Sequence, residues 1–287
     1  MKNREDSVIG IVGLGLMGGA FALALQENGA APGKLLACDI DKESLEMALA
    51  EKIIDEGFSN PEAMLPRCDL VFLCLNPQVL LRFMEKQMTF FKSGSLITDI
   101  AGIKGNICAI VEKNLRPDLD FIPGHPMAGS EKGGFANARR CSFKGKNYIL
   151  TPLERNKKEN LEYLKNLIYR MGFGRITETT AEEHDRKIAF TSQLCHVIAS
   201  ALVDCEGDTE ITRFGGGSFE DLTRIAMLNA PLWTELFIEN RRELLARITQ
   251  FEESLDALKT LIAEEAGTEL ESRLDAVRER RIKMQEA

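Results

Sequence analysis

From residue 8 the chain has an apolar run, a glycine-rich turn and a helical pattern, in that order. Residues 8–12 predict a buried strand, and the small residues of 17–28 predict a helix. The G-x-G-x-x-G spacing between them is made by Gly13, Leu14, Gly15, Leu16, Met17 and Gly18. Glycines at these places allow a tight turn, a close approach of the backbone to a pyrophosphate, and close packing of helix on strand. The start of the chain therefore predicts the first strand–turn–helix unit of a nucleotide-binding sheet.

Apolar runs and helical patterns continue to alternate up to residue 179. Further strands are predicted at 34–39, 69–75, 95–99, 147–150 and 175–179. Helices are predicted between them, at 42–51, 77–88, 104–115 and 155–171. Alternation of this kind indicates βαβ crossovers and a mostly parallel sheet that is covered on both faces. We therefore expect an α/β fold, with a Rossmann-like doubly wound sheet in a domain over residues 1–179.

Strand signals end at residue 180. Thr180 and Glu183 have the spacing of a capping box, which predicts the start of a helix over 181–205. A glycine-rich turn at 215–217 follows, and further helices are predicted through Ser218, Pro231 and Gly267. A helical segment of this length barely encloses a core of its own. We therefore expect residues 180–287 to form an all-helical dimerisation domain that packs against a second copy of the chain.

Composition restricts the class of protein. The 287 residues carry a formal net charge of −8, which argues against nucleic acid as a general partner. No apolar run reaches the roughly 18 residues of a membrane span, so no membrane association is expected. The mixed charges of residues 1–6 do not resemble a signal peptide. The seven cysteines are scattered through mostly apolar runs, which predicts reduced thiols in the cytoplasm.

An acidic residue stands where a nucleotide-binding sheet would need one. Asp39 lies 21 residues after Gly18, at the end of the second predicted strand. A carboxylate there can accept hydrogen bonds from both ribose hydroxyls of NAD. Asp39 and Asp41 would repel the 2′-phosphate of NADP, and no arginine directly follows, so we expect NAD. FAD is a rival ligand for the same fingerprint, and a glycine-rich turn that binds nothing is the structural alternative.

A second glycine-rich segment, 124–134, carries the histidine of greatest interest. Its eleven residues include four glycines, Pro126, His125 and the acid–base pair Glu131 and Lys132. Such a composition does not suit the interior of a helix or a strand. We expect an irregular segment that holds the His125 imidazole against a bound ligand, where a neutral ring can act as a general base. A loop histidine satisfied by backbone carbonyls is the alternative.

Two further histidines fall in the predicted helix 181–205. His184 lies in its first turn beside acids, which predicts a surface group, and His196 lies among apolar residues, which favours a core position. At about 100° per residue, Asp185, Gln193 and His196 fall near one helix face. Such a polar stripe on an apolar helix predicts a lined cavity. No metal site is expected, because neither the histidines nor the cysteines have the spacing of metal ligands.

A third distinctive string covers residues 215–226 and reads Gly-Gly-Gly-Ser-Phe-Glu-Asp-Leu-Thr-Arg-Ile-Ala. Asp221 and Arg224 are three residues apart, a spacing at which they would simply pair on a helix surface. Trp233, the only tryptophan, follows Arg224 by nine residues. A single tryptophan is more often part of a core than of a ligand site.

These strings together resemble the prephenate dehydrogenase family. The family signature His-Pro-(Met/Ile)-Ala-Gly-(Ser/Thr)-Glu-Lys is similar to the run that begins at His125 and ends at Lys132. The family run Gly-Gly-Gly-Phe-x-Asp-x-Thr-Arg-Ile-Ala, with a tryptophan nine residues after its arginine, is similar to 215–226 and Trp233. The resemblance extends from about residue 8 to the helices after Trp233, which is nearly the whole chain.

The resemblance implies a role for each matching residue. His125 would be the catalytic base, and Arg224 would bind a substrate carboxylate. His196 and Trp233 would line the substrate pocket, and Asp185 matches a family acid at the start of the same helix. The implied cofactor is NAD, bound at the G-x-G-x-x-G turn and Asp39.

Two departures from the family pattern bear on that site. The family commonly has Asp-x-Gly-Ser-x-Lys after a sheet strand, with the serine contacting the catalytic histidine, whereas this chain has Gly102 at the serine position. We expect that hydrogen bond to be absent, or replaced by water or by Ser130. The family's Ser-His-x-x-His has Gln193 in place of its first histidine. Lys132 would add local positive charge for an anionic substrate.

The reaction implied by the resemblance is the NAD-dependent oxidative decarboxylation of prephenate to 4-hydroxyphenylpyruvate, a step of tyrosine biosynthesis. Arogenate, which differs by an amino group on the side chain, is the alternative substrate. A β-hydroxyacid dehydrogenase is a rival function, because Gly-Leu-Gly-Leu-Met-Gly also occurs in that class. A regulator that binds NAD but has lost most of its catalysis is the second rival.

Overall fold

Six short strands pair in parallel to form the larger of two sheets in the computed structural model, which describes residues 6–31, 33–129 and 132–286. The order across the sheet is β3-β2-β1-β4-β5-β6. The strands are β1 (Ile9–Val12), β2 (Leu35–Cys38), β3 (Glu56–Phe58), β4 (Leu70–Leu73), β5 (Leu96–Asp99) and β6 (Asp120–Ile122). The strand order reverses between β1 and β4, and ligands of doubly wound sheets bind at such a switch point.

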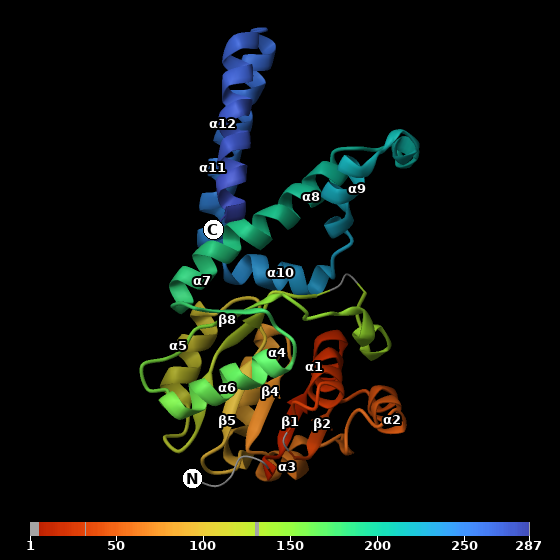
Figure 1. Cartoon of the computed structure of the whole chain (residues 1–287), viewed down its shortest axis with the longest axis vertical. Helices are drawn as coiled ribbons and strands as arrows, with labels where there is room; N and C mark the ends of the chain where they lie inside the picture. Colours follow the sequence, from red (N-terminus) through yellow and green to blue (C-terminus); the bar gives the residue numbers. More distant parts are fainter. Residues whose placement is uncertain (1–5, 32, 130–131, 287) are drawn as a thin grey trace. The chain divides into compact units, whose positions relative to one another are not determined.

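Helices cover both faces of this sheet (Figure 1). One face packs against α1 (Leu16–Glu27), α2 (Lys42–Ala50) and α6 (Lys158–Arg170). The other packs against α3 (Pro61–Met64), α4 (Pro77–Gln87) and α5 (Gly105–Asn114). Single-turn segments η2 (Leu65–Arg67) and η3 (Met88–Phe90) extend α3 and α4. β1, β2, β4 and β5 are buried along their whole length, as their continuous apolar runs predict. The predicted α/β fold with a Rossmann-like sheet is confirmed.

A second sheet places the histidine segment. Its order is β7-β8-β9, made by β7 (Gly124–Pro126), β8 (Asn147–Leu150) and β9 (Arg175–Glu178). β7 runs antiparallel to β8, and His125 is opposite Ile149 in that ladder. The 3-10 segment η4 (Phe135–Arg140) follows and packs on α1. The expectation of an irregular segment is therefore wrong at its start: only Pro123 separates β6 from β7, so His125 stands on a strand.

The helical portion begins with α7 (Ala181–Ile188), a π-helical segment η5 (Ala189–Gln193) and α8 (Leu194–Asp204). The Thr180 hydroxyl accepts a hydrogen bond from the Glu183 backbone N–H at 3.2 Å, as the capping box predicts. The single helix expected over 181–205 is thus interrupted by five π-helical residues. The elements that follow are η6 (Thr209–Phe214), α9 (Gly217–Thr223), η7 (Arg224–Ala226) and α10 (Ala230–Glu239).

Backbone contacts group residues 1–240 into one compact unit and residues 241–287 into another. The second unit consists of α11 (Arg241–Ala263) and α12 (Gly267–Glu286), which pack against each other. The domain boundary expected at 179/180 differs from this division and stays a prediction. Within the part of the chain that the structure describes, none of the helices combines the length and apolar character of a membrane span.

Candidate active site

The glycine-rich turn between β1 and α1 has the geometry that its sequence predicts. Gly13 has a φ of +91°, a conformation that L side chains rarely adopt. A Cβ at Gly18 would lie 1.8 Å from the Gly13 carbonyl oxygen, so only glycine allows the helix to start this close to the strand. Above Gly15, by contrast, no described atom lies within 4 Å of such a Cβ. The turn is therefore closely packed at Gly13 and Gly18 and open at Gly15. This arrangement leaves its backbone accessible to a pyrophosphate.

Three helices begin at the same edge of the sheet, and their N-termini differ in charge. α4 is capped by the Glu235 carboxylate of α10, which accepts from the Gln78 backbone N–H. α5 is capped by Asp185 of α7, which accepts from the Gly105 backbone N–H at 2.7 Å. In the described chain α1 has neither a side-chain cap nor an acid in its first turn. The start of α1 thus keeps its N–H groups and positive dipole end for an external anion.

Asp39 follows the end of β2 and faces the glycine-rich turn. Its carboxylate accepts hydrogen bonds from the backbone N–H groups of Leu14 and, at 2.8 Å, Asp41. The next residue, Ile40, is 95% exposed, so the surface beside the carboxylate is apolar and open. An acid and an apolar side chain beside the turn fit a ribose and its base, and Gly13, Gly15, Gly18 and Asp39 thus suit a dinucleotide.

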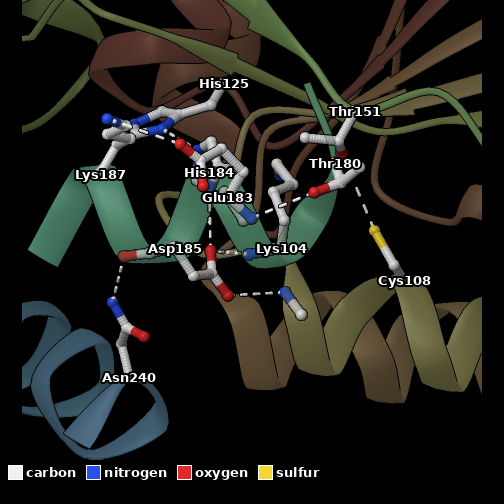
Figure 2. Close-up of polar contacts among 12 residues, drawn as sticks. Lys104, Cys108, His125, Thr151, Thr180, Glu183, His184, Asp185, Lys187 and Asn240 are labelled. Carbon is white, nitrogen blue, oxygen red and sulfur yellow. Dashed lines mark hydrogen bonds and ion pairs between the residues drawn. The ribbon is translucent and has the colours of Figure 1, made fainter. Parts of the chain in front are cut away.

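His125 is one end of a hydrogen-bonded chain of three side chains, with His184 in the middle and Asp185 at the other end (Figure 2). Its Nδ1 lies 2.9 Å from Nε2 of His184, and His184 Nδ1 lies 2.7 Å from the Asp185 carboxylate. His125 stands on β7, whereas His184 and Asp185 stand on α7. The two imidazole rings meet edge to face, with their centroids 5.1 Å apart. The chain therefore joins the sheet portion to the helical portion.

The direction of this chain follows from its acidic end. The Asp185 carboxylate accepts from the backbone N–H groups of Lys104 at 2.8 Å and Gly105 at 2.7 Å, at the positive end of α5. A carboxylate only accepts, so the proton of neutral His184 is on Nδ1 and its Nε2 is an acceptor. His125 Nδ1 then donates to that Nε2. The remaining nitrogen, His125 Nε2, is left with an unprotonated lone pair.

The pKa values of both histidines favour the neutral rings that this chain requires. Burial holds the pKa of His125 well below its usual 6.5, and the neighbouring His184 and Lys104 charges lower it further. Burial also lowers the pKa of His184, although the Asp185 carboxylate acts in the opposite direction. His184 is only 1% exposed, so the prediction that it is a surface group is wrong. Its hydrogen bonds to His125 and Asp185 account for the burial of a polar ring.

The bare His125 Nε2 faces Gly102 and α10. A Cβ at Gly102 would lie 3.8 Å from that nitrogen and 3.3 Å from a methyl carbon of Leu236. Leu236 is buried, and the Gln193 side chain donates to its carbonyl oxygen at 3.0 Å. The space beside the lone pair is thus bounded by a glycine and an apolar side chain. Such a space would exclude water from the reacting group of a bound substrate.

His196 and Trp233 form a second part of this wall. Their rings stack with centroids 3.6 Å apart, and Trp233 also packs beside Phe237 at 5.5 Å. Trp233 stands on α10 one turn before Leu236, so the stacked pair lies next to the space bounded by Gly102. An aromatic wall of this kind suits a flat ring as ligand.

The helix expected to carry Asp185, Gln193 and His196 on one face is interrupted by a π-helical segment, and the lined cavity beside these residues stays a prediction. Asp185 contacts the start of α5, Gln193 donates to α10, and His196 stacks on Trp233. The π-helical turn between α7 and α8 changes the angle per residue, so spacing at 100° does not apply across it. Gln193 and His196 thus both contact α10, and Asn240 at the end of α10 donates to Gln193 and to the Asp185 carbonyl oxygen.

Of the remaining predicted site residues, Arg224 and Lys132 lie at the surface, and Ser130 is not among the residues that the structure describes. Arg224 begins η7 and is exposed, and Lys132 is exposed after the histidine strand. Three further residues of this neighbourhood escaped the sequence analysis: His184, Leu236 and Asn240, which donates to Gln193 and to the Asp185 carbonyl oxygen. The only available signal was the adjacency of a second histidine to Asp185.

The fold and this site together define a Rossmann-type oxidoreductase, and comparisons with known proteins identify its family. Residues 21–177 match the family model described as prephenate dehydrogenase, nucleotide-binding domain, and residues 180–276 match prephenate dehydrogenase, dimerization domain. The chain belongs to the prephenate dehydrogenase family.

Similar proteins cover nearly the whole chain. Prephenate dehydrogenase of Bacillus subtilis is 30% identical over 94% of this chain and 74% of its own length. Cyclohexadienyl dehydrogenase of Zymomonas mobilis is 30% identical over 90% of this chain and 89% of its own. The crystal structure of Aquifex aeolicus prephenate dehydrogenase with hydroxyphenyl propionate and NAD+ superposes with a TM-score of 0.86, at 32% identity, covering 97% of this chain and 98% of that one.

Proposed function

We propose that this protein is an NAD-dependent prephenate dehydrogenase in which His125 is the general base. The observation that carries the proposal is the ordered chain from Asp185 through His184 to His125, which leaves His125 Nε2 unprotonated. A base that removes a hydroxyl proton near pH 7 must be neutral and oriented before the substrate arrives. The lowered pKa of His125 and its fixed Nδ1 partner meet both conditions.

The cofactor would be held by the turn at the start of α1. The backbone of Gly13, Leu14, Gly15, Leu16, Met17 and Gly18 would receive its pyrophosphate, and Asp39 would accept hydrogen bonds from ribose hydroxyls. When bound, NAD accepts the hydride of the reaction. The uncapped N-terminus of α1, beside the acid-capped α4 and α5, supports this placement. Asp39 disfavours the extra phosphate of NADP.

The substrate would lie between His125 Nε2 and the aromatic wall. Trp233 and His196 would contact its ring, and Arg224 would bind a carboxylate. Lys132 and Ser130 belong to the segment after His125 and would contribute charge and a hydroxyl at its rim. Asp185, which the family resemblance places near the substrate, would act through His184, because its carboxylate oxygens are engaged by backbone N–H groups and that ring.

The reaction can be written from these positions. His125 Nε2 takes the proton of the ring hydroxyl while the hydrogen on the same carbon leaves as hydride, and the C–O bond becomes a carbonyl. The bond between the ring and its carboxylate then breaks, and its electron pair completes an aromatic ring as CO2 departs. The carbonyl oxygen receives the displaced electrons as a phenolate and takes back the proton held on His125 Nε2, which gives the phenol of 4-hydroxyphenylpyruvate. Formation of the aromatic ring and loss of CO2 make the step irreversible.

The active assembly would be a homodimer formed through the helical portion. The match of residues 180–276 to a dimerization domain supports this. Among the described residues, most of the exposed large apolar side chains lie at or beyond residue 190; the most exposed of these are Phe214, Met227, Ile262, Leu245 and Met284. A helical surface with so many exposed apolar groups needs a partner to cover it.

The experiment that tests the proposal follows the formation of NADH by its absorbance, with purified protein, NAD and prephenate. Parallel reactions replace prephenate with arogenate or a simple β-hydroxyacid, and NAD with NADP. We expect turnover with prephenate and NAD. Turnover with arogenate alone would transfer the proposal to that substrate. NAD binding without turnover of any of these compounds would contradict the enzymatic proposal and favour a regulator.

A further inference from the structure

A buried ion pair lies beneath the two histidines, and the proposed chemistry does not use it. Lys104 Nζ lies 2.5 Å from Asp99 Oδ2, and both side chains are 0% exposed. Removing two charges from water costs several kcal/mol per ion, and replacing such a pair by apolar residues is often neutral or stabilising. The stability of the fold is therefore a weak explanation for a completely buried ion pair. The other hydrogen bonds of Asp99 and Lys104 suggest a different role.

Asp99 is connected to the backbone on both sides of the base. It ends β5, and its carboxylate accepts from the backbone N–H groups of Ala101 at 2.9 Å and Gly124 at 3.1 Å. Ala101 precedes Gly102, which faces His125 Nε2, and Gly124 precedes His125 itself. One carboxylate thus sets the distance between the segment that bounds the reacting space and the strand that carries the base.

Lys104 is connected to the other ring. Its side chain binds Asp99, while its backbone N–H donates to Asp185 Oδ1 at 2.8 Å. Asp185 in turn orients His184. The same residue therefore joins the acid that positions His125 to the acid that positions His184.

We infer that Asp99 and Lys104 are positioning residues for the general base: they hold the His125 and His184 rings at hydrogen-bonding distance and in a single pair of tautomers. This inference rests on the proposed function of His125. The frame runs through two carboxylates and one lysine. It reaches His125 through the backbone N–H of Gly124 and His184 through the Asp185 carboxylate.

The electrostatic surroundings make Lys104 the charge that matters here. The groups that face the ion pair and the two rings are Tyr148 on β8, Cys74 after β4, Cys108 on α5 and Asp185 on α7. Burial raises the pKa of Tyr148 well above 10, raises that of Cys74 further still above its usual 9, and raises that of Cys108 to about 11, so these three are neutral at pH 7. The Lys104 charge lowers the pKa of both His125 and His184.

The test replaces both charges together, with Asp99→Asn and Lys104→Met in one variant, so that no unpaired charge is left buried. Nitrogen-15 NMR of the ring nitrogens reads the tautomer and the pKa of each histidine without any turnover. The chain has only three histidines, so single His→Asn variants assign the signals. We expect the double variant to lose the single tautomer of His125 and to raise its pKa. The kcat should fall about tenfold or more, because misplacement of a reacting group lowers the rate of the chemical step. The NAD dissociation constant should be unchanged.

A matched control separates positioning from stability. Asp69 and Lys92 form a pair of the same residue types and the same 2.5 Å distance, at the opposite edge of the sheet. Asp69→Asn with Lys92→Met should lower the melting temperature only and leave the three histidine titrations unchanged. If Asp99→Asn with Lys104→Met does the same, the inference is overturned.

Two further variants distinguish a failure to fold, and a failure of the proposed function, from a failure of this inference. Asp99→Asn with Lys104→Gln keeps a hydrogen bond between the side chains and is measured in the same way if the methionine variant does not fold. Wild-type histidine signals in that folded variant would equally overturn the inference. Failure of the proposed function looks different: His125→Asn would keep its kcat, while the ring tautomers and pKa values would still report on the ion pair.

Discussion

The sheet portion and the helical portion up to Asn240 divide the site between them, and they differ in how they are stabilised. β1, β2, β4 and β5 are entirely buried, and two apolar clusters cover the sheet on both faces. In the helical portion, α9 has no buried residue and α10 has only Leu236. Yet the sheet portion contributes the proposed base, and the helical portion contributes the two side chains that orient it. The orientation of the base therefore depends on the portion with the weaker core.

The largest expected effect removes the sheet portion's contribution. His125→Asn keeps a polar side chain on β7 but cannot take a proton in the reaction. We expect kcat to fall by about 10²-fold or more, in the range of lost general-base catalysis, with NAD binding nearly unchanged. Stopped-flow or steady-state NADH formation and an NAD titration measure the two quantities. A variant with wild-type kcat would remove His125 as the base.

The next effect removes the helical portion's contribution. Asp185→Asn leaves one acceptor oxygen for the two backbone N–H groups of α5 and the His184 ring. The tautomers of both rings are then no longer fixed, and we expect kcat to fall about tenfold or more. Glu182→Gln, an exposed acid in the same turn of α7, is the matched control and should keep wild-type kcat. Equal kcat values for the two variants would show that the base needs no partner from α7.

Arg224→Ala tests the helical portion as the site of substrate binding rather than orientation. Loss of a charge-assisted contact to a carboxylate should raise the KM for prephenate about tenfold or more with a smaller change in kcat. Arg213→Ala, in the preceding segment η6, removes an exposed arginine that pairs with Glu210 and serves as control. An unchanged KM for Arg224→Ala would exclude it as the carboxylate anchor.

The pH dependence of stability follows from the histidine pair that joins the portions. The folded-state pKa values of His125 and His184 are lowered, so below about 6.5 the unfolded chain binds protons that the folded chain does not. The free energy of unfolding should therefore decrease as pH falls through 6.5 and below, by up to about 1.4 kcal/mol per pH unit for each histidine. Urea unfolding at several pH values measures this. In His125→Asn the slope should be shallower, and an identical slope would contradict a lowered pKa.

The smallest effect concerns the contact between α10 and α4. Glu235→Gln removes the charge that caps the N-terminus of α4. We expect a loss of about 1 kcal/mol in the free energy of unfolding, the usual cost of a lost cap, with little change in kcat. Glu85→Gln, an exposed acid within α4, is the comparison and should change stability less. A large kcat loss for Glu235→Gln would mean that this contact also holds the wall of the site.

Sequence reasoning recovers the sheet portion better than the contacts between portions. The G-x-G-x-x-G turn, its flanking strand and helix and the central strands are predictable because each is specified by a local pattern. β3 and β6 are missed because three-residue strands carry almost no periodic signal. β7 is missed because its Gly-His-Pro sequence has no strand propensity, and it forms through pairing with β8.

Within the site, the difference is one of distance along the chain. His125 is noticeable in its own glycine-rich segment, whereas the role of His184 depends on a partner 59 residues away. A histidine beside acids in a first helical turn has the local pattern of a surface residue, and only tertiary contacts bury it. Leu236 and Asn240 have no local signal at all, because their importance comes from what α10 faces.

The π-helical segment 189–193 has a consequence for how this protein tolerates change. It places one extra residue in the turn between α7 and α8, so it sets the rotation of His184 and Asp185 relative to His196 by chain length rather than by side-chain identity. Substitutions within the segment leave that rotation alone. Deletion of a single residue there would turn one half of the helix by about 100° against the other and separate the orienting pair from the aromatic wall. The number of residues in this segment therefore fixes part of the geometry of the active site.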